Sequence, residues 1–515
     1  MFDLPVIPPQ KTASARRAAL EELVRRKAAT RLESFVRLAW PLLNPGVPLC
    51  WAPWMTDLCL HLEALREGKL FRTMVANYPP GCSKTTICSI CWPVWSWGQD
   101  GGTSRWWFGT WSELNGRDQQ KQRRDLLLSS LFALVFAPKW RLKDDSNSVK
   151  WFKTTALGWY RHTTPLSRDA TGAHGDYFVM DDVVPASAAF TDEALIVRQW
   201  WVGTMESRVR NRLTTRKLYV GQRICTLDLC ELWRDNGEVD CNFVLPAEGE
   251  PSLAYPPTPL GFVDRRAMGE PLFPARFPPE VLESIKASIP SAVWMAQHQQ
   301  RPGAGEAMKF PAESLRRWSV LPSRRADEYI GAFDTAGGQS IAEARKKDPD
   351  WNVGQVWGRW GDDFYLVAQL RNRSEFATFE SEALAFIMAH PEAKHWVIEG
   401  RSTGSPLKSS LSARLLRMWR EGEIPPAMGQ PPSLERKPVQ SNKEARIFAS
   451  TVHYEHGHVY VPGEVLAEFK AEAMAWPKGR FDDQIDCAAA ALDSFTPRGG
   501  HSKASASYLR AGIKG

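Results

Sequence analysis

The stretch Tyr78-Pro79-Pro80-Gly81-Cys82-Ser83-Lys84-Thr85-Thr86 lies between two apolar runs of the 515-residue sequence. The run before it, residues 71–77, predicts a strand, and the run after it predicts a helix. At such a strand-to-helix turn, backbone N–H groups can hold a phosphate, a lysine can neutralise its oxygens and a threonine hydroxyl can bind Mg²⁺. The stretch therefore indicates a phosphate-binding loop in an α/β domain, with the binding residues Gly81, Cys82, Ser83, Lys84 and Thr85.

The match to the common phosphate-loop pattern is incomplete. Tyr78 stands where the first glycine of that pattern belongs, and Ser83 replaces the glycine before Lys84. Taken alone, the stretch fits an ordinary Pro-Gly turn equally well. The assignment therefore depends on motifs further along the chain.

A predicted strand over residues 177–180 ends in Asp181-Asp182. In nucleotide hydrolysis, the first carboxylate of such a pair holds Mg²⁺ and the second polarises the attacking water. Alone, an acidic pair after a strand is more often a turn or a helix cap. Downstream of Lys84 it favours an ATP site, with Asp181 binding the cofactor and Asp182 catalytic. A third predicted strand ends in Gln222 and Arg223, polar groups that could sense the γ-phosphate.

A second set of carboxylates follows strand-like runs in the C-terminal half. Residues 329–333 end in Asp334, and two further runs, 351–357 and 364–370, flank a turn, which predicts three adjacent antiparallel strands. Residues 395–398 then lead to Glu399, and Asp482, Asp483 and Asp486 precede an Ala-rich helix. This order is the layout of an RNase H-like nuclease, whose carboxylates hold two Mg²⁺ or Mn²⁺ ions.

Each of these acids also has a simpler explanation. Asp334 fits a turn, Glu399 a surface charge, and Asp482 a helix N-cap with Asp483 favouring the helix dipole. Asp483 and Asp486 share a helix face, and so do Asp482 and Asp486, so spacing does not identify the third ligand. We expect catalytic roles for Asp334, Glu399, Asp482 and Asp483, and metal binding by these four and Asp486.

Bulk composition is compatible with this interpretation but does not establish it. The chain has 65 basic and 58 acidic residues, a small excess for a protein that binds a polyanion. Nine scattered cysteines, no signal peptide and no membrane-spanning run favour a reducing cytoplasm. The Cys88-x-x-Cys91 pair lacks a second pair at zinc-finger spacing and predicts buried core thiols.

Composition shifts predict five segments. They are a basic helical segment at 1–44, a P-loop ATPase domain at 45–250, a Pro-rich linker or bridging subdomain at 251–323, an RNase H-like nuclease domain at 324–497 and a basic tail at 498–515.

In this order the motifs resemble the terminase large subunit family of tailed bacteriophages, from about Trp51 to Phe495. The segments that carry the resemblance are 77–85, 171–182, 295–302, 333–336, 397–400, 443–446 and 476–486. The resemblance implies ATP and Mg²⁺ at Lys84, Thr85 and Asp181, with Asp182 where many relatives carry Glu. It also implies nuclease ligands at Asp334, Glu399 and the Asp482-Asp483 pair.

The same resemblance implies partners and a location. These are double-stranded DNA, a small terminase subunit, the portal protein of a procapsid and a pentameric ring of large subunits in the host cytoplasm, without membrane contact. Many relatives have an arginine in or before the phosphate loop, whereas this chain has Gly81 and Cys82, so Arg117 and Arg124 are the remaining arginine-finger candidates. Two other interpretations are a helicase or repair ATPase fused to a nuclease, and a structural DNA-binding protein with inactive sites.

Overall fold

The computed structural model describes residues 13–148, 150–167, 172–189, 192–303, 310–335, 351–399, 404–436, 443–477 and 479–496. The predicted basic tail, the ends of several motifs (Thr171, Ala336 and Gly400) and Lys478 lie outside these residues. The described chain divides into two compact units. One comprises residues up to 283 together with 293–303, and the other comprises residues 284–292 together with those from 310 to 496. The predicted division into five segments stays a prediction.

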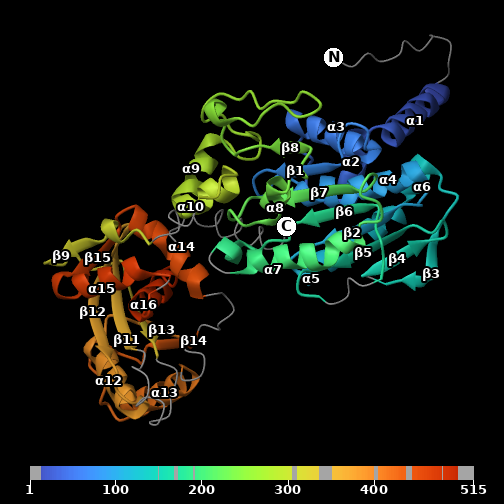
Figure 1. Ribbon diagram of the computed structural model, residues 1–515. Coiled ribbons are helices and arrows are strands. Elements are labelled where there is room, and N and C mark those ends of the chain that lie inside the picture. The colour runs from blue at the N-terminus through green and yellow to red at the C-terminus, as the bar shows by residue number, and fades with distance from the viewer. Residues whose placement is uncertain are drawn as a thin grey trace. The chain divides into compact units, whose positions relative to one another are not determined.

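The first unit is built on an eight-stranded sheet with the order β3-β4-β5-β2-β6-β7-β1-β8, and Figure 1 shows these strands side by side. From β5 to β8 all neighbouring strands are parallel, whereas β3, β4 and β5 pair antiparallel. The strands are β1 Thr73–Asn77, β2 Arg105–Gly109, β3 Leu142–Asn147, β4 Trp151–Thr154, β5 Trp159–Thr163, β6 Tyr177–Asp181, β7 Arg216–Gly221 and β8 Cys241–Val244.

The helices of this unit pack on a sheet whose central strands are apolar. All residues of β1 and β6 are buried, as expected for strands covered on both faces. The helices are α1 Ala13–Thr30, α2 Leu32–Leu43, α3 Pro53–Glu67, the π-helix η1 Thr85–Cys91, α4 Trp92–Asp100, α5 Glu113–Leu127, α6 Ser130–Phe136, α7 Glu193–Trp200, the π-helix η3 Trp201–Met205, α8 Leu229–Asp235 and the π-helix η6 Trp294–His298. Two further helices, α9 Pro279–Ser288 and α10 Ser291–Val293, each include residues of both units.

Two details bear on the sequence predictions. The N-terminal basic segment forms two helices, because Arg31 adopts an extended conformation between α1 and α2. Cys88 and Cys91 are buried thiols of the first unit. No helix among the described residues is long and apolar enough to cross a membrane.

The second unit contains a seven-stranded sheet with the order β14-β13-β10-β11-β12-β15-β9. The predicted antiparallel arrangement of β10, β11 and β12 is confirmed, and β13 adds parallel to β10. The strands are β9 Arg316–Trp318, β10 Glu328–Asp334, β11 Asn352–Trp360, β12 Asp363–Asn372, β13 His395–Glu399, β14 Ser433–Arg436 and β15 Val459–Pro462.

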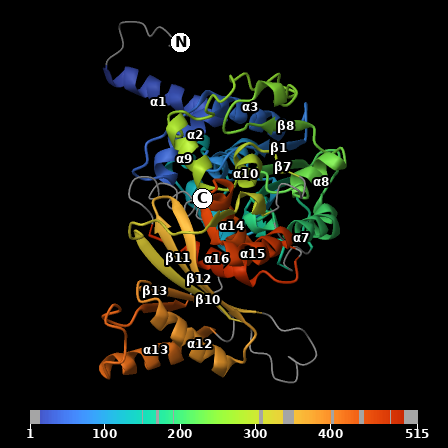
Figure 2. The same cartoon turned by 90° about the vertical axis from the view of Figure 1, so that its left-hand side faces the viewer.

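Helices cover this second sheet, as Figure 2 shows. They are α12 Phe376–Ala389, α13 Gly404–Arg420, α14 Lys443–Glu455, α15 Gly463–Ala475 and α16 Asp483–Leu492. Phe333 and Trp396 belong to the apolar core that the sheet shares with α12 and α13. The backbone carbonyl oxygen of Ala332, the residue before Phe333, accepts a hydrogen bond from the Cys487 thiol of α16. Because side chains alternate along a strand, Asp334 lies on the α16 side. The two mixed sheets confirm the predicted α/β fold class.

Candidate functional site

The predicted phosphate loop connects the buried strand β1 to η1. Gly81 has φ +77°, and a Cβ there would lie 2.8 Å from Cζ of Phe277, so the turn and the close packing both require glycine. Ser83 has φ +59°, the left-handed conformation that glycine adopts most easily. Ser83 therefore takes the backbone shape of the glycine that it replaces, at some cost in strain.

Lys84 points inward from the loop. Its side chain is buried, and Nζ donates a hydrogen bond to the carbonyl oxygen of Tyr78 at 3.2 Å and another to Oε1 of Gln222. Gln222 directly follows β7, which lies between β1 and β6 in the sheet. The structure thus brings Lys84 and the predicted sensor strand together, and places that strand between the loop and the acidic pair.

Asp181 ends β6 and is 2% exposed. Burial, followed by the charge of Asp182, raises its pKa to about 6, while the hydroxyls of Ser89 and Thr85 and the charge of Lys84 oppose this increase. The hydroxyl of the half-buried Thr85 therefore lies beside the buried Asp181 carboxylate. Oxygen donors of this kind are the ligands that Mg²⁺ prefers, so these residues fit the implied ion.

Asp182 has a different environment. It is half-buried and has φ +45°, a conformation that costs a non-glycine residue energy. A Cβ on Gly221 would lie 2.8 Å from its Oδ1, so Asp182 reaches over the end of β7. Backbone strain of this sort is common where a side chain must be held in a working position.

Two residues that the sequence analysis did not identify support Asp181. Gln119 of α5 donates from Nε2 to Oδ2 of Asp181 at 3.0 Å, and its Oε1 accepts from Arg123 at 2.9 Å. Arg123 is fully buried, donates to the Ser89 carbonyl of η1 at 2.5 Å and lies over the ring of Phe108 at 3.6 Å. Burial lowers the pKa of Arg123 to about 9. One polar network thus connects α5, η1 and the acidic pair.

The segment 293–303 returns to the first unit and packs beside this site. Oε1 of Gln300 accepts from the backbone N–H of Arg223 at 3.0 Å, just after Gln222. Burial, with a smaller effect from the charge of Lys84, lowers the pKa of His298 to about 4. The 295–302 motif therefore lies within electrostatic reach of the phosphate loop.

The arginine-finger candidates lie on the outer part of α5. Arg117 is half-exposed and forms an ion pair with Glu113 at 2.9 Å. Arg124 is partly buried and follows Arg123. Their expected role as an arginine finger stays a prediction.

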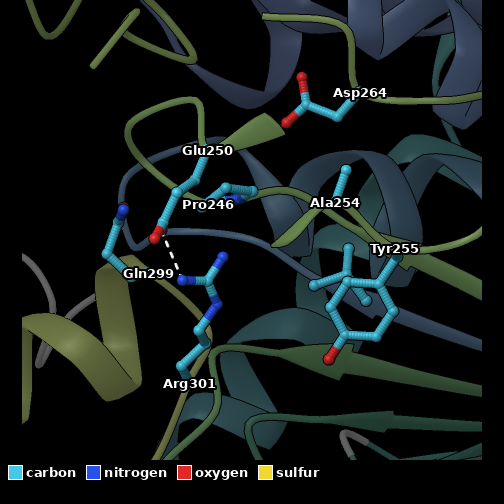
Figure 3. Close-up of a pocket in the computed structure, with 8 residues that line it drawn as sticks. Pro246, Glu250, Ala254, Tyr255, Asp264, Gln299 and Arg301 are labelled. Atoms are coloured by element: carbon cyan, nitrogen blue, oxygen red, sulfur yellow. Dashed lines mark hydrogen bonds and ion pairs between the residues drawn. The ribbon is translucent and has the colours of Figure 1, made fainter. Parts of the chain in front are cut away.

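A small cavity lies at the carboxyl end of β8, and Figure 3 shows its lining. Val244 faces it and pairs in register with Asn77, the last residue of β1. Its volume of about 10 Å³ admits roughly one water molecule, too little for a nucleotide base. An ion pair between Glu250 and Arg301 at 2.5 Å closes one side. The other lining residues are Pro246, Ala254, Tyr255, Asp264 and Gln299.

In the second unit, backbone pairing brings two predicted acids together. Asp334 and Glu399 end the adjacent parallel strands β10 and β13 and are register partners. Both side chains are buried, and they point toward the same face because residues paired in register do so. The sequence predicted that each acid ends a strand; the structure places the two ends side by side.

The acidic helix start meets these carboxylates. Asp483 and Asp486 of α16 are 8% and 2% exposed, and the charges of both act on Asp334. Burial and the charge of Asp486 raise the pKa of Asp334 well above its usual range. The same two causes raise the pKa of Glu399, although Arg446 and Lys443 oppose them.

Asp482 occupies the N-cap position of α16 but makes no side-chain capping hydrogen bond. Oε1 of Glu472 on α15 takes this role by accepting from the backbone N–H of Gln484 at 2.6 Å. The side chain of Asp482 is 34% exposed and pairs with Lys443 at 2.8 Å. Helix capping therefore does not explain Asp482, and burial singles out Asp483 and Asp486.

Two basic residues of α14 lie among the acids. Lys443 contacts Asp486 at 2.9 Å and Asp334 at 3.9 Å, and Arg446 pairs with Glu399 at 2.6 Å and also with Asp486. Among the residues described, no three acidic, His or Cys side chains converge closely enough to form a metal site as they stand. Buried carboxylates are ligands that fit Mg²⁺ or Mn²⁺. In the structure, Lys443 and Arg446 neutralise the negative charge of these carboxylates.

Comparison with known proteins gives one family match. Residues 331–495 match the family model of the terminase RNase H-like domain. No curated protein matches the sequence.

Three solved structures illustrate the structural comparison. The large terminase of a thermophilic bacteriophage in complex with ATP-gamma-S is 10% identical, with 91% of this chain and 97% of that chain covered and a TM-score of 0.45. The HK97 bacteriophage large terminase is 10% identical, with 88% and 96% covered and a TM-score of 0.34. The large terminase nuclease of thermophilic phage G20c with bound zinc is 15% identical, with 37% and 99% covered and a TM-score of 0.25.

Proposed function

We propose that this chain, whose residues 331–495 match the terminase RNase H-like domain, is a phage large terminase subunit that uses ATP hydrolysis to move double-stranded viral DNA into a procapsid and cuts that DNA in its second unit. The observation that carries the proposal is the meeting of Asp334, Glu399 and the start of α16 at one end of the second sheet. The first unit adds a phosphate loop whose lysine contacts the sensor strand.

In the proposed ATPase reaction, the loop N–H groups and Lys84 bind the phosphates, which requires Lys84 to leave the Tyr78 carbonyl. Asp181 and Thr85 hold Mg²⁺, which when bound neutralises charge on the phosphate oxygens. Asp182 orients the attacking water. Gln222 loses its hydrogen bond with Lys84 and contacts the γ-phosphate instead. Loss of that phosphate on hydrolysis therefore changes the contacts at the end of β7.

In the proposed nuclease reaction, Asp334, Glu399 and Asp483 hold divalent ions, with Asp482 and Asp486 as further ligands. Bound Mg²⁺ or Mn²⁺ supplies an activated water and stabilises the leaving oxygen of the phosphodiester. With an ion in place, Lys443 and Arg446 would no longer be needed to neutralise the carboxylates and could bind phosphate oxygens instead. We further propose that the chain acts as a pentamer in the host cytoplasm. Its partners there are double-stranded DNA, a small terminase subunit and a portal protein.

The test is packaging of DNA into purified procapsids by the recombinant chain, with ATP hydrolysis measured in parallel. Lys84→Ala should abolish both. Lys69→Ala is the matched control, because its side chain is 81% exposed. ATP hydrolysis by Lys84→Ala at the wild-type rate would contradict the phosphate-loop assignment.

Cleavage of plasmid DNA with Mn²⁺ tests the second unit separately. Asp334→Ala and Glu399→Ala should each lose cleavage and keep ATPase activity, while the exposed Glu464→Gln should keep both. ATPase activity and DNA cleavage without packaging would favour the helicase or repair ATPase fused to a nuclease. Absence of both activities in the wild-type chain would favour the structural DNA-binding protein.

A further inference from the structure

Five side chains of the second unit form an alternating series of guanidinium groups and aromatic rings, here termed the Arg–aromatic stack. Arg371 and Arg373 lie over the Trp351 ring at 4.2 and 4.1 Å. Arg373 also lies 5.3 Å from the Phe481 ring, over which Arg480 lies at 5.0 Å. Contacts of this length are attractive and fix the planes of the guanidinium groups.

The stack is anchored to α15, the helix whose Glu472 contacts the start of α16. Arg371 pairs with Glu468 at 2.6 Å and with Glu472 at 3.4 Å on α15. Glu472 is the residue that accepts from the first N–H groups of α16. Movement of Arg371 would therefore disturb the start of the helix that bears Asp483 and Asp486.

Both rings lie next to active-site positions in the chain. Phe481 directly precedes Asp482, which contacts Lys443. Trp351 is two residues before Val353, the register partner of Asp334 on the neighbouring strand. The stack therefore borders the acidic site, with Arg480 exposed and Arg373, Trp351 and Phe481 half-buried.

The chemistry of the stack favours phosphate over bases. With two guanidinium groups within 4.2 Å of its ring, Trp351 offers little free face for a stacking base. A guanidinium over a ring still presents N–H groups at its edge, and these match a phosphate in a fork geometry. Arg373 and Arg480 both flank Phe481, the neighbour of Asp482, so they are the arginines of the stack best placed to hold a phosphate beside the acidic site.

We propose that the Arg–aromatic stack binds the sugar-phosphate backbone of the DNA strand beside the phosphodiester that is cut. The proposal rests on the proposed nuclease function of the same unit. Arg373 and Arg480 each contact a phosphate, while Trp351 and Phe481 hold their planes in place. Since the contacts are to phosphates, the stack does not read sequence.

The experiment measures binding of the full chain to a fluorescent blunt duplex by anisotropy, in EDTA and over a series of salt concentrations. Arg373→Gln combined with Arg480→Gln should reduce the slope of log Kd against log salt by about 2, since each lost phosphate contact removes about one unit. Arg373→Lys should keep most of the slope because the charge remains. Arg316→Gln, which removes a cation–π contact with Tyr460 at 5.6 Å at the far edge of the sheet, should leave it unchanged.

Three further readouts separate the explanations. With Mn²⁺, the double variant should show a raised KM for plasmid cleavage with kcat nearly retained, and unchanged ATPase activity and circular dichroism would show that it folds. A wild-type slope in the double variant would overturn the proposal, and so would weakened binding confined to single-stranded DNA, because that result indicates base stacking. If the wild-type chain does not cleave DNA but the double variant still has a reduced slope of log Kd against log salt, the proposed nuclease function is wrong. The proposed contact between the stack and DNA would then still hold.

Discussion

The buried carboxylate of Asp181 leads to a prediction about stability as well as catalysis. Its pKa is raised from 3.8 to about 6, so the folded chain binds this proton more tightly than the unfolded chain does. The buried charge of Asp181 lowers the free energy of unfolding. This loss of stability is absent below about pH 4 and complete above about pH 6. With about 1.4 kcal/mol for each pKa unit, the cost at pH 7.5 is about 3 kcal/mol.

Asp181→Asn removes the charge, keeps the shape and retains an acceptor for Gln119. In EDTA at pH 7.5 the variant should be more stable than wild type by about 3 kcal/mol, equivalent to about 5 °C in the Tm of the first unit. The gain should shrink as pH falls from 6 to 4. ATP hydrolysis should be lost, because the variant gives up the proposed Mg²⁺ ligand.

Thermal unfolding at several pH values checks this, and the transition of the first unit is the one that ADP with Mg²⁺ shifts in wild type. Nucleotide with Mg²⁺ should narrow the gap between the two proteins, since the ion compensates the charge of Asp181 only in wild type. An unchanged or lowered Tm of Asp181→Asn at pH 7.5 in EDTA would refute the reasoning.

Three other outcomes are expected. Arg123→Gln should cost about 3 kcal/mol in unfolding experiments, because it breaks a fully buried charged network, whereas the half-exposed Arg117→Gln should change stability by less than about 1 kcal/mol. Asp483→Asn should abolish Mg²⁺-dependent DNA cleavage, and Asp482→Asn should reduce it less, because Asp482 is one-third exposed; equal losses would make both acids ligands. Gly81→Ala should destabilise the loop by about 1 kcal/mol or more and weaken nucleotide binding in calorimetry, since it adds strain at φ +77° and a clash with Phe277.

The sequence predicted the elements that carry chemistry because apolar strands ending in polar residues leave a clear local pattern. Asp181, Asp334 and Glu399 lie at the ends of β6, β10 and β13, and Lys84 lies in the loop between β1 and η1, as the pattern predicted. Which other residues lie beside these side chains in space depends on the order of the strands in each sheet. Local sequence patterns do not encode that order. The position of β7 between the phosphate loop and β6 is an example.

Residues on helices were harder to assign. Gln119 and Arg123 belong to a run of polar residues in α5 that has the composition of a solvated helix, and only their burial reveals the contact with Asp181. The capping role expected for Asp482 belongs to Glu472, whose position near α16 follows from tertiary packing. Sequence spacing could not show whether Asp482 or Glu472 caps α16.

The register between β10 and β13 determines how the proposed nuclease site can be tested by substitution. Asp334 and Glu399 are far apart in the sequence, and a backbone hydrogen-bond ladder holds them side by side. Removing either carboxylate therefore leaves the position of the other intact. Single and double substitutions at these positions form a thermodynamic cycle, and a departure from additivity that appears only when Mg²⁺ or Mn²⁺ is added reports an ion shared by the two carboxylates.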